Sequence, residues 1–216
     1  MKKITLHIIV DPLCGWTYAS VPLIIAAEST VGLTVEIHNG GMLTGHNVKP
    51  VSAAWREFAI KNDSIIAQKT GQLFGTNYTD GLLKMSGITL DSAPAITAIL
   101  AAQELGISAG EMLSSVQHAY YAQGQNIMQL NVLTEVAAEL GLNKRTFETH
   151  FNALEGDATA QHIAQSRGLL REINGQGFPS AAFEFDNCQW QHADIASFYG
   201  KTAQWSNYLR QSLALG

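Results

Sequence analysis

Cysteine is scarce in this chain of 216 residues, which holds only Cys14 and Cys188. Two cysteines are too few for the disulfide framework of a small secreted domain, and their separation does not match the spacing of zinc ligands. The seven histidines are scattered and include no His-x-x-x-His pair. The sequence therefore predicts neither a disulfide scaffold nor a metal site.

Long apolar runs and blocks of like charge are also missing. No apolar run is long enough for a transmembrane helix, and no small-residue cleavage site follows the short apolar stretch near the N-terminus. The formal net charge of -5 is small and argues against general nucleic-acid binding. We expect a cytoplasmic protein with no membrane and no nucleic-acid partner.

An ordinary globular composition is present, in a chain long enough to bury a good core. Residues 4–10 are β-branched and apolar and predict a buried strand, whereas residues 19–29 are rich in Ala, Leu and Ile and predict a helix. Cys14 therefore lies where a strand ends and a helix begins. Unpaired N–H groups and the helix dipole favour negative charge there, so we expect its thiol to ionise easily into the nucleophilic thiolate.

The neighbours of Cys14 suggest further roles. Gly15 is small and should leave the sulfur uncovered, and Trp16 offers an apolar wall. Thr17 has two interpretations: its hydroxyl donates a hydrogen bond that lowers the pKa of the thiolate, or it only fills space. Asp11 ends the strand, caps the helix or transfers protons, and its charge would oppose the thiolate.

A second strand follows the predicted helix. Residues 33–38 alternate apolar and polar side chains, which completes a βαβ unit with the first strand and helix. Gly40 and Gly41 then predict a turn. Alternatively, these glycines let the backbone approach a ligand near Cys14.

Strand signals almost vanish between residues 51 and 170, where helical patterns follow one another. Ser92 should cap the first of these helices, with Pro94 in its first turn. Most of these residues are expected only to pack in a bundle. The predicted helices cover residues 95–102, 112–121, 132–140, 143–151 and 158–173.

The last part of the chain returns to strand patterns. Pro179 precedes a predicted strand at residues 181–185, and a turn at residues 186–187 leads into a short returning strand at residues 188–190. Residues 195–215 predict a helix, and four of its side chains fall roughly at core spacing. These are Phe198, Trp205, Tyr208 and Leu209.

The string from Asp11 to Tyr18 resembles the active site of the DsbA family, and more closely its cytoplasmic branch of FrnE-like dithiol-disulfide isomerases. The helical middle and the segment Gly177-Phe178-Pro179 also resemble this family, in which the latter is a cis-proline loop that faces the catalytic cysteine. The resemblance implies an α/β thioredoxin-like fold with a large helical insertion. We expect residues 1–45 and 175–216 to form the thioredoxin-like domain and residues 46–174 the helical insertion domain.

The motif departs from the family pattern Cys-x-x-Cys, because Thr17 stands where the second cysteine is usual. No disulfide can close within such a motif, so an outside thiol such as glutathione, or another substrate thiol, must resolve the mixed disulfide. Cys188 lies across a predicted hairpin and is not expected to do so. The candidate catalytic residues are Cys14 and Thr17; the candidate substrate-binding residues are Gly15, Trp16, Phe178 and Pro179, with Tyr18 a weaker candidate.

The expected function is a monothiol thiol-disulfide oxidoreductase or isomerase. Its partners would be protein or peptide thiols and disulfides, or glutathione as a co-substrate, with no permanently bound cofactor. One alternative is a glutathione-dependent enzyme like the kappa-class transferases and the 2-hydroxychromene-2-carboxylate isomerases, which use Ser where Cys14 stands. The other is a binding module for peptides that has lost its redox chemistry.

Overall fold

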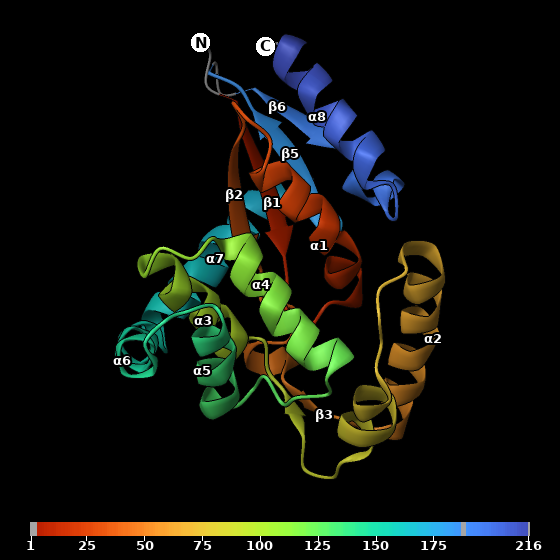
Figure 1. Ribbon diagram of the computed structural model, residues 1–216, viewed down its shortest axis with the longest axis vertical. Coiled ribbons are helices and arrows are strands. Elements are labelled where there is room, and N and C mark those ends of the chain that lie inside the picture. The colour runs from red at the N-terminus through yellow and green to blue at the C-terminus, as the bar shows by residue number, and fades with distance from the viewer. Residues whose placement is uncertain (1–3, 187–188, 216) are drawn as a thin grey trace.

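The computed structural model describes residues 4–186 and 189–215 and builds them around a four-stranded sheet (Figure 1). The strand order is β2-β1-β5-β6, with β1 parallel to β2 and antiparallel to β5. Both ends of the chain therefore contribute to one sheet. The strands are β1 (Thr5–Val10), β2 (Thr34–Asn39), β5 (Ser180–Glu184) and β6 (Trp190–Ala193).

The βαβ unit predicted near the N-terminus is confirmed, since α1 (Gly15–Glu28) connects β1 to the parallel β2. Alternate residues of β1 point to opposite faces of the sheet. Leu6 and Ile8 belong to the main apolar core, whereas Ile9 packs in a smaller cluster. The register places His7 opposite Glu36.

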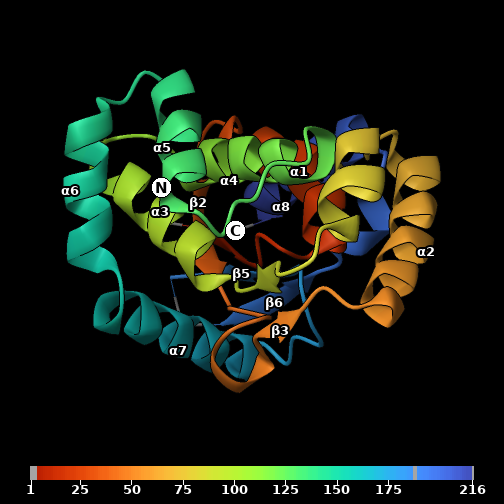
Figure 2. The same cartoon turned by 90° about the horizontal axis from the view of Figure 1, so that it is seen from below.

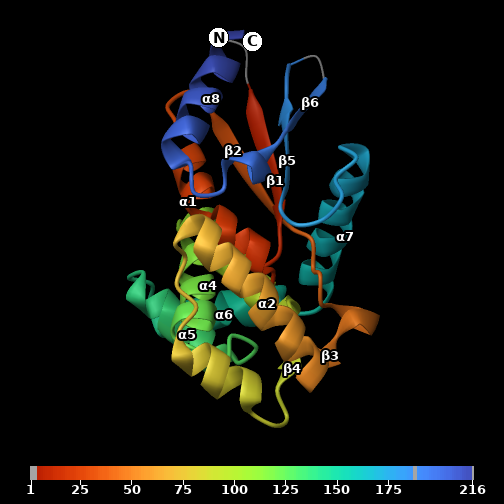
Figure 3. The ribbon, with the colours of Figure 1, turned by 90° about the vertical axis from the view of Figure 1, so that its right-hand side faces the viewer.

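Helices cover the two faces of the sheet unequally, as Figure 3 shows. On one face, α1 packs against α8 (Thr202–Leu215). On the other, α7 (Asp157–Glu172) lies along β2 and covers part of the sheet. Ile9 and Ala182 pack there against Ile173, just after α7.

The chain between β2 and β5 is mostly helical. Figure 2 shows α2 and α6 on opposite flanks of this region. Besides α7, its helices are α2 (Ala53–Thr70), α3 (Ala93–Glu104), α4 (Ala109–Gln117), α5 (Leu130–Glu139) and α6 (Lys144–Leu154). The remaining elements are the paired β3 (Lys49–Pro50) and β4 (Thr89–Leu90), and single 3-10 or π turns at Gly45–Asn47, Asn77–Gly81, Leu82–Lys84, His118–Ala122 and Ile195–Phe198.

Sequence patterns predict α3 to α7 to within a few residues, but they miss α2. This helix has clear ends, because the Ser52 side chain accepts the Trp55 N–H and Gly71 adopts a left-handed φ of 76°. Only three of its residues are buried, and one of them, Asp63, is an acid. So narrow a buried strip produces no apolar periodicity.

Two local predictions are wrong. Ser92 stands at the N-cap of α3, but its hydroxyl donates to the Asp11 carboxylate instead of capping the helix. The predicted helix at residues 195–215 is interrupted after a 3-10 turn, because Gly200 adopts a φ of 73° that only glycine takes readily. Trp205 and Leu209 are fully buried, as their spacing predicted.

The proposed domain boundaries stay a prediction. The helical region packs directly on the rest of the chain, since α4 contacts α1 and one apolar core includes residues of both parts. In the predicted hairpin, Asn187 of the turn and Cys188 of the returning strand lie outside the described residues. None of the described helices has the length and hydropathy that crossing a membrane requires.

Candidate functional site around Cys14

Cys14 occupies the N-cap of α1, between the end of β1 and the first helical residue. Its backbone is extended, with φ −93° and ψ 117°, and its N–H donates to the Asp11 carbonyl at 3.1 Å. The predicted placement of Cys14 between strand and helix is confirmed.

The loop before β5 faces this cysteine. The Cys14 thiol donates to the carbonyl oxygen of Phe178 at 3.3 Å, across a sequence separation of 164 residues. The peptide bond between Phe178 and Pro179 is cis, as the resemblance implied. Gly40 makes room for this loop, because a Cβ at Gly40 would lie 2.2 Å from the Phe178 ring.

The sulfur of Cys14 is covered, contrary to expectation. Only 8% of the residue is exposed. The space that the absent Gly15 side chain leaves is taken by α2, since a Cβ there would lie 3.0 Å from both Asp63 Oδ1 and Ile66 Cδ1. Gly15 therefore allows α2 to approach the site instead of opening the site to solvent.

The expectation that Cys14 ionises easily is also wrong for the protein alone. Burial raises the pKa of its thiol to about 11. Backbone N–H groups of Thr17 and Trp16 act in the opposite direction, as a helix start should, while the Asp11 charge raises the pKa further. The loss of hydration outweighs the hydrogen bonds, so the resting group is a thiol that donates to Phe178.

Thr17 combines the two interpretations that the sequence left open. Its side chain is fully buried and therefore fills the space under Cys14. Its hydroxyl acts to lower the pKa of the Cys14 thiol, although less strongly than burial raises it. The same oxygen accepts the Asp11 N–H at 3.2 Å.

Asp11 organises the turn that carries Cys14. Its carboxylate accepts hydrogen bonds from the Leu13 N–H at 2.8 Å, the Ser92 hydroxyl at 3.0 Å and the Met42 N–H at 2.5 Å. Burial raises the pKa of Asp11 to about 6. The carboxylate thus joins β1, the loop after β2 and α3, and a role in proton transfer stays a prediction.

Gln117 on α4 also holds this turn and was not singled out from the sequence. Its Nε2 donates to the carbonyl oxygens of Pro12 at 3.1 Å and Cys14 at 3.4 Å. No local signal identifies it, because its role depends on how α4 packs against α1.

Trp16 lies between two cavities. The Cys14 cavity, of about 400 Å³, reaches under α2, and the proline-loop cavity, of about 490 Å³, borders the cis-proline. Both volumes are typical of sites for small molecules. Residues that line the Cys14 cavity include Cys14, Gly15, Lys49, Trp55, Asp63 and Tyr78; those of the proline-loop cavity include Lys69, Phe178, Pro179 and Tyr199. Tyr18 lines neither, and its hydroxyl donates to the Leu73 carbonyl.

Asp63 is a second acid near Cys14, and the sequence analysis did not identify it. It is 5% exposed, and its Oδ2 accepts the Tyr78 hydroxyl at 3.0 Å. Burial raises the pKa of Asp63 to about 7, so the group can gain or lose a proton near neutral pH. Since α2 itself was missed, no sequence signal placed this carboxyl beside Gly15.

Two lysines border the cavities. Lys49 Nζ lies 4.8 Å from the centre of the Trp55 ring, and Lys69 Nζ lies 5.4 Å from that of Tyr199. Within the described part of the chain, neither ammonium has a carboxylate at ion-pair distance. Each cavity therefore offers one cation to an anionic ligand.

A cysteine at the start of the helix after β1, facing a cis-proline before an antiparallel strand, defines a thiol-disulfide oxidoreductase of the thioredoxin fold. The model of the DSBA-like thioredoxin domain matches residues 5–198. The chain therefore belongs to the DSBA-like thioredoxin domain family. The comparison with curated proteins found no match.

Solved structures include similar proteins along nearly the whole chain. The cytosolic disulfide reductase DsbM from Pseudomonas aeruginosa is 40% identical, with a TM-score of 0.91 over 98% of this chain and 100% of that chain. The same protein has been solved with GSH, with 40% identity and a TM-score of 0.89 over 97% and 99% of the two chains. The 2-hydroxychromene-2-carboxylate isomerase, at 15% identity and a TM-score of 0.58 over 98% and 99%, shares the fold.

Proposed function

We propose that this protein is a monothiol thiol-disulfide oxidoreductase that exchanges glutathione with protein or peptide thiols. The observation that carries the proposal is the contact of Cys14 Sγ with the Phe178 carbonyl, with Thr17 at the usual place of a resolving cysteine. Cys14 is the only cysteine in the described residues. Cys188 lies outside them, and we still expect it to take no part.

The chemistry proceeds by two exchanges. The Cys14 thiolate attacks the glutathionyl sulfur of a protein mixed disulfide, which releases the protein thiolate and leaves glutathione joined to Cys14. The thiolate of a second glutathione then attacks this disulfide, so that oxidised glutathione leaves and Cys14 regains its proton. One protein thiol is regenerated for each disulfide of glutathione formed, and no intramolecular disulfide is needed.

The two cavities suit a small peptide thiol that bridges Trp16. Glutathione carries two carboxylates, and Lys49 and Lys69 offer one ammonium to each end. The Phe178 N–H donates to no described residue, so an extended peptide can pair with it as an added strand does. The complex of the 40% identical DsbM with GSH supports this choice of ligand.

Activation requires that Cys14 lose both its cover and its proton. A ligand that enters the Cys14 cavity would separate α2 from Gly15 and replace the bond to Phe178. Asp63 lines the same cavity and has a pKa of about 7, so we propose that it accepts the proton of the thiol.

A cytoplasmic location suits this chemistry, since glutathione is abundant there, and DsbM is described as cytosolic.

The test uses intact mass spectrometry after incubation with oxidised glutathione. The parent protein should gain one glutathionyl group, and reduced glutathione should remove it. Cys14→Ser, which keeps Cys188, should gain a glutathionyl group much more slowly. Equal adducts on both proteins would mean that Cys14 is not the reactive thiol. The binding-module alternative would then be preferred.

The lysines give a second measurement on the same reaction. Lys49→Met and Lys69→Met should each slow adduct formation about fivefold, because each removes roughly 1 kcal/mol of charge pairing. Lys61→Met, on the exposed side of α2, is the matched control and should react like the parent. Equal rates for all three variants would leave Cys14 reactive but place glutathione elsewhere.

A further inference from the structure

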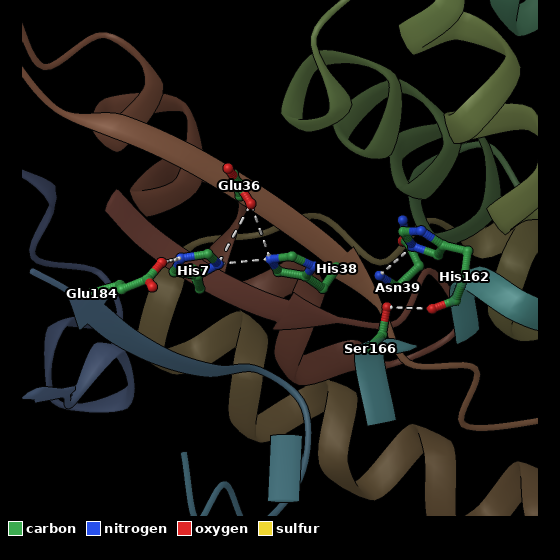
Figure 4. Close-up of polar contacts among 7 residues, drawn as sticks. All are labelled: His7, Glu36, His38, Asn39, His162, Ser166 and Glu184. Atoms are coloured by element: carbon green, nitrogen blue, oxygen red, sulfur yellow. Dashed lines mark hydrogen bonds and ion pairs between the residues drawn. The ribbon is translucent and has the colours of Figure 1, made fainter. Parts of the chain in front are cut away.

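Two histidines and a glutamate meet on the sheet face that α7 leaves partly open, outside both cavities at Cys14 (Figure 4). His7 Nδ1 lies 2.9 Å from His38 Nε2, and Glu36 Oε2 lies 3.6 Å from the former and 3.8 Å from the latter. The three donor atoms therefore form a small triangle (Figure 4).

The size of this triangle matches the coordination shell of a small cation. Two ligands of a tetrahedral zinc ion with bonds of about 2.0–2.1 Å lie roughly 3.3 Å apart. The three observed separations fall on either side of that value.

A second carboxylate orients His7 as it would in a metal site. His7 Nε2 lies 3.0 Å from Glu184 Oε2, and because an ionised carboxylate only accepts, the ring nitrogen donates. The lone pair of a neutral His7 ring is then on Nδ1, which faces His38 and Glu36. A carboxylate behind a histidine ligand is a recurrent feature of zinc sites.

The backbone holds the donors in place. His7 and Glu36 are direct partners in the parallel β1–β2 pair, and His38 follows on the same face of β2. Trp190 of β6 packs its ring against that of His7, with centroids 5.1 Å apart. Ligands carried by a hydrogen-bonded sheet need little ordering when an ion binds.

An ion can reach the triangle from solvent. The side chain of Glu36 is 50% exposed and that of His38 is 21% exposed, whereas that of His7 is 8% exposed. Glu36 and His38 also line a cavity of about 530 Å³ beside α7. The site thus has one buried ligand, two accessible ligands and an entry path.

We propose that His7 Nδ1, His38 Nε2 and Glu36 Oε2 bind one divalent transition-metal ion, with zinc the best match to two imidazoles and a carboxylate. Three protein ligands leave a fourth position for water. When the ion binds, the proton between the two rings leaves His38 Nε2 for its Nδ1 or for solvent. The ion would join β1 to β2, and β5 through Glu184, independently of the thiol chemistry.

The test measures zinc binding to tag-free protein with Cys14→Ser and Cys188→Ser, so that no thiolate can contribute. Competition with a chromogenic chelator should give one zinc per chain. Glu36→Gln and His38→Gln should each weaken binding at least about 100-fold, and Glu184→Gln about tenfold. Cobalt(II) in place of zinc should give a visible spectrum of nitrogen and oxygen ligation without a sulfur charge-transfer band.

A matched pair on α3 and α6 controls for surface binding. His150 Nδ1 and Glu104 Oε2 are 2.6 Å apart and have no third ligand among the described residues, so Glu104→Gln and His150→Gln should leave zinc affinity unchanged. Glu36 is half exposed, and its replacement should not prevent folding. The proposal would be overturned if zinc did not bind saturably, or if Glu36→Gln and His38→Gln left binding intact. The cluster would then be a hydrogen-bonded network only.

Discussion

At the scale of the residue, opposing influences act on the Cys14 thiol. The start of α1 supplies N–H groups that stabilise a thiolate, and the Thr17 hydroxyl adds to them. Burial removes water from the same sulfur and raises its pKa to about 11. Because desolvation is the larger influence, the reactivity of Cys14 depends on whether the cover over it opens.

Thr17→Cys should restore the motif that the family usually carries. Thr17 is buried beside Cys14, and its side-chain oxygen lies close enough to influence the thiol. We expect a disulfide between residues 14 and 17 under mild oxidant, with dithiol oxidant or reductant activity that the parent lacks. Thiol titration and mass spectrometry on a Cys188→Ser background measure it.

Thr17→Ser is the control for that substitution, since it keeps the hydroxyl and adds no sulfur. It should form no internal disulfide. If the Thr17→Cys variant folds but both thiols stay reduced under the oxidant, the inferred geometry of the motif is wrong.

At the scale of the element, α2 determines access to Cys14. Ile66 is fully buried against Gly15, whereas the adjacent Ile65 is 46% exposed. The helix therefore touches the site through one narrow strip, and loosening that strip should expose the sulfur without any change at Cys14 itself.

Ile66→Ala should lower the free energy of unfolding by about 2–5 kcal/mol, because it leaves a cavity under α2. It should also speed the reaction of Cys14 with a thiol reagent under native conditions. Denaturant unfolding and reagent kinetics on a Cys188→Ser background measure the two effects.

Ile65→Ala is the matched control and should change the free energy of unfolding by no more than about 0.5 kcal/mol. A destabilised Ile66→Ala protein whose Cys14 reacts no faster than that of the parent would show that α2 is not the cover.

At the scale of the whole molecule, two buried carboxyl groups link stability to pH. The pKa of Asp63 is raised from 3.8 to about 7, and that of Asp11 to about 6. Between pH 4 and 7 the folded protein keeps the Asp63 proton that the unfolded chain has lost. The folded state is therefore stabilised at low pH, and this contribution is lost as pH rises through 7.

Asp63→Asn should remove that dependence. Relative to the parent, its free energy of unfolding should increase between pH 4 and 8, by up to about 4 kcal/mol at 1.36 kcal/mol per pKa unit. Urea unfolding at several pH values measures it. Asp157→Asn on the exposed start of α7 controls for the loss of one charge. Parallel pH curves for Asp63→Asn and the parent would contradict the raised pKa.

The sequence by itself determined β1, α1 and the place of Cys14 between them, together with the loop that ends at Pro179. These features depend on a run of β-branched apolar residues, on helix propensity and on turn residues, each within a short stretch of chain. The resemblance of the motif to a known family added the fold, which the structure and the family match confirm.

Only the tertiary structure decided which groups surround the chemistry. The cover of Cys14 by Asp63 and Ile66 depends on how α2 docks, and its own sequence shows no apolar period. His7 and His38 are 31 residues apart and become neighbours only through the register of β1 with β2. Burial and strand register are set by segments far apart in the chain, and a local pattern carries no record of them.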